Sequence, residues 1–132
     1  MIRHTLLVAA LLLTVACDDD DGTEADRFGV GAQCAGGDED LCDDDVEDDF
    51  DLVCLPQFKG GYCGLEACEG DLDCPEGSAC VLHEDEQTYC FRICLDKSEC
   101  NFNRDVDNES NCSSNVDFVE ATGVKACVPP SA

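Results

Sequence analysis

Cysteine is the residue type whose chemistry dominates this sequence, because 13 of the 132 residues are cysteines. Two thiols can oxidise to a disulfide or, as thiolates, bind zinc or an iron–sulfur cluster. Zinc ribbons and most iron–sulfur sites use a Cys-x-x-Cys spacing, and no such pair occurs here; the closest two, Cys90 and Cys94, are separated by three residues. The spacing therefore predicts structural disulfides, an oxidising compartment and no resident cofactor.

Twelve of the cysteines fall into three successive groups of four. The groups are Cys34, Cys42, Cys54 and Cys63; Cys68, Cys74, Cys80 and Cys90; and Cys94, Cys100, Cys112 and Cys127. Four cysteines allow three pairings, and the sequence does not decide among them. We favour the first with the third and the second with the fourth in each group, because this pairing clips the opening loop onto both strands of a hairpin. On the loop-entropy model each disulfide contributes about 3 kcal/mol.

The thirteenth cysteine, Cys17, follows a short apolar segment. Residues 1–16 have a basic start, an apolar run too short to span a bilayer, and a small last residue, as a secretory signal peptide has. The five residues Leu13-Thr14-Val15-Ala16-Cys17 resemble the bacterial lipobox, although Thr14 stands where Leu is usual. The resemblance implies that Cys17 is acylated and anchors an exported protein to a bacterial membrane, expected to be the outer membrane or the cell surface. The alternative is an ordinary secretory signal, with Cys17 as a spare thiol in an otherwise even set.

The rest of the chain offers little for an ordinary hydrophobic core. It has no Trp, two Tyr and six Phe, and no window shows a convincing helical period. Short apolar runs between Gly and Pro turn signals predict a pair of short strands within each of 52–63, 79–93 and 116–128, the last of them a final hairpin. We therefore expect a small disulfide-rich fold: three tandem four-cysteine modules of loops and short β-hairpins, with little or no helix apart from the signal peptide.

The predicted organisation follows the cysteine groups. We expect a signal peptide at 1–16; the lipidated Cys17 and an acidic disordered tether at 17–33; modules at 34–67, 68–93 and 94–128; and a tail at 129–132. The tether is predicted because 18–26 contains six acidic residues and no long apolar side chain.

Two acidic clusters could supply oxygen ligands for Ca²⁺. The candidate ligands are Asp43, Asp45 and Asp49 in the first module and Asp105, Asp107 and Glu109 in the third. Neither cluster is an EF-hand, because after Asp105 the sixth position is Ser110 and the twelfth is Val116. Diffuse association of cations with a chain of formal net charge −24 is the competing interpretation. Asp71 and Asp73 are expected to cap backbone amides near Cys74 instead.

The centre of the chain carries a family resemblance. Cys68-x2-Asp71-x-Asp73-Cys74-x2-Gly77-x2-Cys80 resembles the N-terminal cysteine-rich domain of Dickkopf proteins and the tandem cysteine-rich repeats of bacterial surface lipoproteins. The resemblance implies a small extracellular disulfide-rich module used for binding.

The sequence gives little support to catalysis. Its one histidine after the signal peptide, His83, lies in a polar stretch and is expected to be a solvated loop residue, and no nucleophile motif accompanies it. We expect a membrane-anchored, non-catalytic interaction or adhesion module. Its partner is expected to be a protein or cell-surface molecule, and a cationic one if charge attracts it. Nucleic acid is not expected, because the acidic surface would repel it. The alternatives are a Ca²⁺-dependent binding protein and, third, a protease-inhibitor-like scaffold that uses the loop at 81–89.

Overall fold

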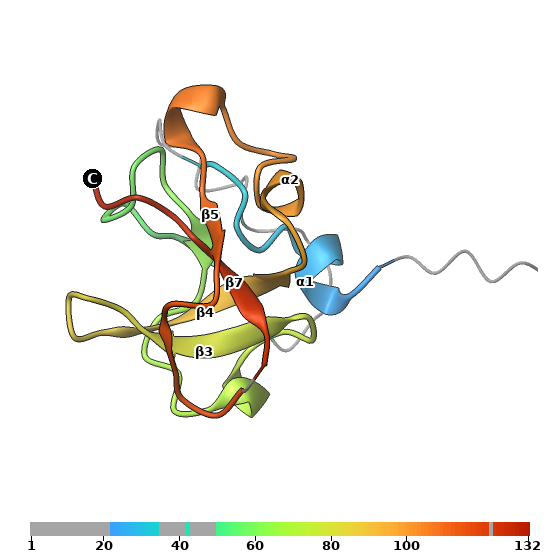
Figure 1. The fold of residues 1–132 in the computed structure, drawn as a ribbon, viewed down its shortest axis with the longest axis vertical. Coiled ribbons are helices and arrows are strands. Elements are labelled where there is room, and N and C mark those ends of the chain that lie inside the picture. Colours follow the sequence, from blue (N-terminus) through green and yellow to red (C-terminus); the bar gives the residue numbers. More distant parts are fainter. Residues whose placement is uncertain (1–21, 35–41, 43–49, 122) are drawn as a thin grey trace, which may run out of the picture.

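The computed structural model describes residues 22–34, 42, 50–121 and 123–132 (Figure 1). The strands are β1 (Val53–Cys54), β2 (Cys63–Gly64), β3 (Ser78–Leu82), β4 (Thr88–Cys94), β5 (Asn111–Ser113), β6 (Asp117–Phe118) and β7 (Lys125–Val128). The helices are α1 (Glu24–Arg27) and α2 (Lys97–Cys100), with short 3-10 turns η2 (Asp71–Asp73) and η3 (Val106–Asn108). The fold is thus the small disulfide-rich assembly of strands and hairpins that the sequence predicts.

Six disulfides join the twelve cysteines. The pairs are Cys34–Cys54, Cys42–Cys63, Cys68–Cys80, Cys74–Cys90, Cys94–Cys112 and Cys100–Cys127. Each group of four is closed on itself, first with third and second with fourth, which is the pairing favoured from the sequence. Because so many disulfides form and persist in an oxidising space, the protein is an exported one. None of the helices in the described part of the chain is long and apolar enough to cross a bilayer.

The longest hairpin lies where the sequence predicts it. Strands β3 and β4 pair antiparallel, with Cys80 opposite Cys90. The turn before β3 closes through a hydrogen bond from the Ser78 amide to the Pro75 carbonyl, and Gly77 supplies the positive φ of 90°. Gly60 and Gly61, which both have positive φ, lie in the connection between the paired strands β1 and β2.

Strands β1 and β2 of the first cysteine group form a two-stranded sheet of their own, whereas the second and third groups share a five-stranded sheet. Its strand order is β5-β7-β4-β3-β6, so β4 pairs with β3 in its own group and with β7 of the third group. The final hairpin expected within 116–128 is wrong: β6 pairs with β3, and β7 pairs with β4 and β5. Strands β5 and β6 lie at opposite edges, yet only residues 114–116 connect them. A connection that short reaches about 14 Å at most, so the sheet curls until its two edges approach each other.

Aromatic rings form the centre of the core. Phe58, Tyr62, Tyr89 and Phe91 are almost completely buried and contact one another edge-on or stacked, with centroids 5.0 to 6.0 Å apart. Such pairs add about 0.5–1.5 kcal/mol to the gain from burial. The rings come from the first and second groups, so the modules are packed together and not strung along the chain.

The residues at 22–33 are not a tether. Thr23 and Asp26 form a capping box that begins α1, and Ala25, Phe28 and Val30 are buried in the core. The Ala25 amide donates to the Glu76 carbonyl at 2.8 Å, which docks α1 beside the turn that precedes β3 (Figure 1). The prediction of disorder for this stretch is therefore wrong, because three apolar side chains and a capping box outweigh the charge repulsion. The part of the prediction at 17–21 lies outside the described residues.

The residues at 129–132 also pack on the body. Pro129 is buried, Ser131 forms a β-bridge with Phe58, and the Lys59 amide donates to the Pro130 carbonyl at 2.8 Å. The last residues therefore act as an additional short strand against the first group.

Candidate functional site

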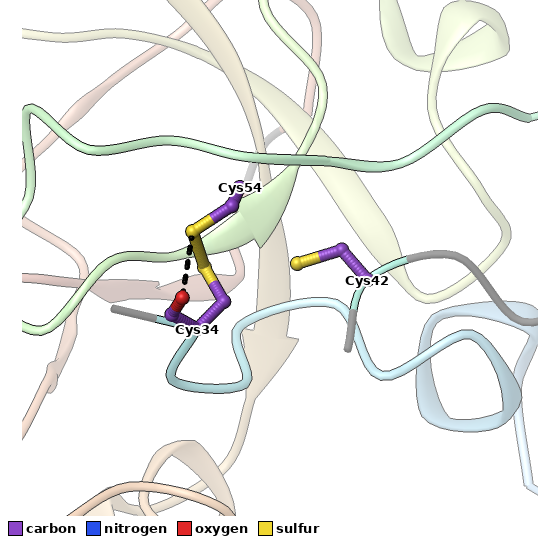
Figure 2. Close-up of side chains that lie close together, drawn as sticks. All are labelled: Cys34, Cys42 and Cys54. Carbon is purple, nitrogen blue, oxygen red and sulfur yellow. Dashed lines mark hydrogen bonds between the residues drawn. A yellow bond between two sulfur atoms is a disulfide. The ribbon is translucent and has the colours of Figure 1, made fainter. Parts of the chain in front are cut away.

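The cysteines bring their sulfur atoms into three close groups. Within each group the sulfurs lie within 4.8 Å of one another; the groups are Cys34, Cys42 and Cys54; Cys68, Cys74 and Cys90; and Cys94, Cys100 and Cys112. Figure 2 shows the first: Cys34 and Cys54 are joined, and the sulfur of Cys42, which is bonded to Cys63, lies beside them. An oxidised sulfur is not a thiolate and does not bind zinc. These groups are therefore crossings of two disulfides and belong to the scaffold.

Several predicted site residues lie outside the described part of the chain. These are the lipidation candidate Cys17 and the first-module ligand candidates Asp43, Asp45 and Asp49. Acylation and any Ca²⁺ site in the first module stay predictions.

The carboxylates of the third module have other partners. Asp105 accepts a hydrogen bond from the Gln33 amide nitrogen at 2.8 Å, Glu109 pairs with the Lys97 ammonium at 2.5 Å, and Asp107 is exposed. Among the described residues, the only groups of three candidate ligands are made of cysteines. The structure therefore does not bring Asp105, Asp107 and Glu109 together as a Ca²⁺ site.

Asp71 and Asp73 cap backbone amides, as the sequence predicts. Asp71 accepts from the Cys80 amide at 2.9 Å, and Asp73 accepts from the Glu69 amide at 2.8 Å. Both carboxylates hold the loop that contains Cys74.

His83 is not the solvated loop residue that the sequence predicts. Its side chain is only 9% exposed, and its ring meets Phe58 edge-on with centroids 5.2 Å apart. Nδ1 lies 3.4 Å from an Asp85 carboxylate oxygen, too far for a strong hydrogen bond. His83 is therefore a packing residue at the end of the aromatic core, because the β3–β4 hairpin folds its first loop residue inward.

A large hollow on the described surface is a groove at the two approaching edges of the sheet. Its volume is 720 Å³, within the range of small binding sites. We define this β5–β6 groove by six of its lining residues: Leu82, Glu84, Glu86, Asn111, Val116 and Asp117. They come from the end of β3, the hairpin loop, β5 and the connection into β6. The groove exists because the sheet curls without closing.

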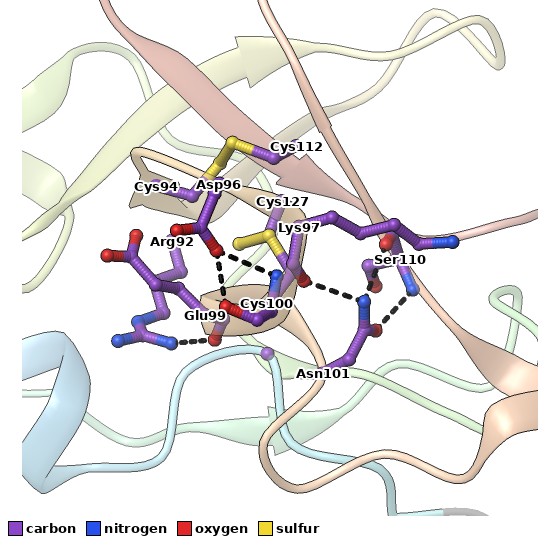
Figure 3. The surroundings of a disulfide bond; sticks show 12 residues. Arg92, Cys94, Asp96, Lys97, Glu99, Cys100, Asn101, Ser110, Cys112 and Cys127 are labelled. Carbon is purple, nitrogen blue, oxygen red and sulfur yellow. Dashed lines mark hydrogen bonds between the residues drawn. A yellow bond between two sulfur atoms is a disulfide. The ribbon is translucent and has the colours of Figure 1, made fainter.

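Neighbouring residues hold β5 in place at one side of this groove. In Figure 3, Asn101 bonds both polar groups of the Ser110 backbone: its side-chain nitrogen donates to the Ser110 carbonyl at 2.9 Å, and its oxygen accepts from the Ser110 amide at 2.7 Å. Asp96 caps α2 by accepting from the Ser98 amide at 2.9 Å. The disulfide Cys94–Cys112 ties β5 to the end of β4, and Cys100–Cys127 ties β7 to α2. The edge strand is thus rigidly supported.

A second, smaller hollow of 480 Å³ lies between α1 and α2. Ala25, Gly29 and Val30 line one side, and Phe102, which is 88% exposed, stands on the other. Arg92 crosses this region, pairs with Asp26 and donates to the Glu99 carbonyl. Arg92 therefore links both helices to β4.

The β5–β6 groove has no signature in the sequence. Its lining residues extend over 50 positions, from 81 to 131, and most of them come from stretches that look like ordinary polar loops in the sequence. Two short helices that the sequence analysis left out do carry local signals: the capping box Thr23-Glu24-Ala25-Asp26 begins α1, and the N-cap Asp96, followed three residues later by Glu99, begins α2.

No protein-family model, curated protein or solved structure matches this chain. The likeness to Dickkopf domains and lipoprotein repeats therefore stays an expectation from the cysteine spacing.

Proposed function

We propose that the protein is a lipid-anchored, extracytoplasmic binding module without catalytic activity. The observation that carries the proposal is the use of the cysteines. All twelve from Cys34 onward are paired in six disulfides, which leaves Cys17 as the one cysteine outside the scaffold. Cys17 directly follows a signal-like apolar segment, which is the position at which a lipoprotein cysteine is acylated.

The docking of α1 supports a short connection to the membrane. Among the described residues, Thr23 is the first with contacts to the folded body, and five residues, 18–22, separate it from Cys17. Six residue steps span roughly 20 Å when fully extended. The folded body would therefore be held close to the lipid surface, with α1 on the side nearest to the anchor.

The packing of His83 supports a non-catalytic role. A general base must reach the proton that it removes, whereas this ring is enclosed by Phe58, Tyr89 and Phe91. The scaffold instead offers a rigid groove, which suits binding.

The anchor is tested by intact mass spectrometry of protein extracted from membranes, with and without reduction. We expect the mass of two or three acyl chains on Cys17, no reactive thiol before reduction and twelve thiols after it. The Cys17→Ser variant should leave the membrane fraction, whereas Asp18→Asn, the matched control, should stay in it. Retention of Cys17→Ser in the membrane, or several reactive thiols in the native protein, would refute the proposal.

A further inference from the structure

The β5–β6 groove has an acidic rim. Glu84 and Glu86 in the hairpin loop and Asp117 at the start of β6 line it, and no Lys or Arg does. Within the described part of the chain, none of these three carboxylates takes part in an ion pair. Their charges are thus available to a partner, and they add to the field of a chain with formal net charge −24.

The inside of the groove is partly apolar. Leu82 is 43% exposed, and Val116, Val128 and Pro130 also line the groove. Val116 and Val128 pack against the hydrophobic core from their half-buried positions. A ligand that carries only charged groups would leave this apolar surface exposed to water. Lysine and arginine side chains suit both features, because an aliphatic stem can cover apolar surface while the cationic head reaches a carboxylate.

One wall of the groove is an edge strand. β5 pairs with β7 only, so within the described structure it has no strand neighbour on its other side. Asn111 and Ser113 point into the groove, whereas Cys112 between them is held by its disulfide. An edge strand beside a groove is the arrangement that binds an extended segment, whose alternate side chains enter the pockets.

We propose that the β5–β6 groove binds an extended, basic segment of another exported protein. The lysine or arginine heads of that segment pair with Glu84, Glu86 and Asp117, and their stems lie on Leu82 and Val116. This assignment rests on the proposed binding function and names its partner chemistry. It does not depend on the lipid anchor.

The test uses the full mature chain carrying Cys17→Ser and a fluorescent peptide of four Lys-Thr repeats. Fluorescence anisotropy measures its affinity, and amide chemical shifts in NMR spectra locate it. We expect saturable binding, with the largest shifts at residues 82–86, 111–117 and 128–131. A peptide of four Glu-Thr repeats should not bind.

The decisive comparison is between two sets of three neutralised carboxylates. The affinity for the Lys-Thr peptide should fall about tenfold when Glu84→Gln, Glu86→Gln and Asp117→Asn are combined. The control set is Glu69→Gln, Glu76→Gln and Asp107→Asn, which are exposed and do not line the groove. The control removes the same charge and should weaken binding less than about threefold.

Equal weakening by both sets, or chemical shifts spread over the whole surface, would show diffuse charge attraction and overturn the groove assignment. The absence of any peptide binding would overturn it as well. Either result leaves the membrane anchor intact, because acylation of Cys17 is measured separately in membrane extracts.

Discussion

The guanidinium of Arg104 lies over the ring of Tyr62, with its central carbon 5.8 Å from the ring centroid. Both residues are buried. The same guanidinium donates hydrogen bonds to the carbonyls of Lys59 and Gly61 at 2.8 Å, Asn108 at 2.7 Å and Gly31 at 3.2 Å. Burial lowers the pKa of Arg104 from its ordinary value. One cation thus joins the N-terminal segment, the first cysteine group and the third.

Replacing Arg104 should destabilise the fold strongly. In Arg104→Met the apolar contact with Tyr62 is kept, but four carbonyls lose their donor. A buried group left without its partner costs about 1–3 kcal/mol, so we expect a loss of about 3 kcal/mol or more in the free energy of unfolding. Guanidinium denaturation with intact disulfides measures it. Lys125→Met, which removes an exposed cation, should change stability by less than about 0.5 kcal/mol; similar values for both variants would contradict the role of Arg104.

Gly77→Ala should detach α1 from the body. Gly77 has a φ of +90°, and an added Cβ would lie 2.2 Å from the Thr23 hydroxyl oxygen. We expect faster amide hydrogen exchange at Ala25 and Val30 and faster trypsin cleavage after Arg27. Gly123→Ala is the matched control, because Gly123 also has positive φ, at 72°, but an added Cβ would meet nothing within 4 Å. Unchanged protection of α1 in Gly77→Ala would show that the contact with Thr23 does not hold the helix.

Tyr62 should make the fold sensitive to high pH. Burial raises the pKa of Tyr62 to about 12, whereas an unfolded chain titrates near its ordinary value of 10. The folded state therefore binds this proton more tightly, so its contribution is fully present below about pH 10 and is lost as the pH rises towards 12. The loss amounts to about 2–3 kcal/mol.

The Tyr62→Phe variant isolates this effect. At pH 7 it should be less stable by about 1–2 kcal/mol, since the hydroxyl accepts from the Arg92 amide at 3.1 Å and donates to the Cys127 carbonyl at 3.3 Å. Between pH 10 and 12 its unfolding free energy should fall less steeply than that of the wild type. Parallel curves for the two proteins would refute the assignment to Tyr62.

The disulfides should differ in their contribution according to the loop that each closes. Cys100 and Cys127 are 27 positions apart, whereas Cys68 and Cys80 are 12 apart. On the loop-entropy model, replacing the first pair by alanines costs about 3.5 kcal/mol and the second about 3 kcal/mol. Thermal unfolding of both double variants tests this order. A larger loss for the Cys68–Cys80 pair would show that local packing, and not chain entropy, dominates.

The sequence determines the features that depend on neighbouring residues. The cysteine content predicts a cross-linked scaffold, and the turn residues Pro75 and Gly77 with the short apolar runs after them predict the β3–β4 hairpin, because turn geometry and strand propensity are local properties. That each disulfide closes within its own group of four is local too, since each spans only 12 to 27 positions, but the sequence does not decide which of the three pairings a group adopts. The capping of backbone amides by Asp71 and Asp73 is also a local property, because the carboxylates and the amides belong to the same short stretch of chain.

Only the tertiary structure decides the features that depend on distant partners. Arg104 is buried because carbonyls 43 to 73 positions away surround it, and His83 is packed because Phe58 lies beside its hairpin. The β5–β6 groove arises because β6 pairs with β3 while β5 pairs with β7, which brings the two edges together. The free energy that selects these contacts comes from burial and hydrogen bonding across the whole body, which the local sequence does not encode.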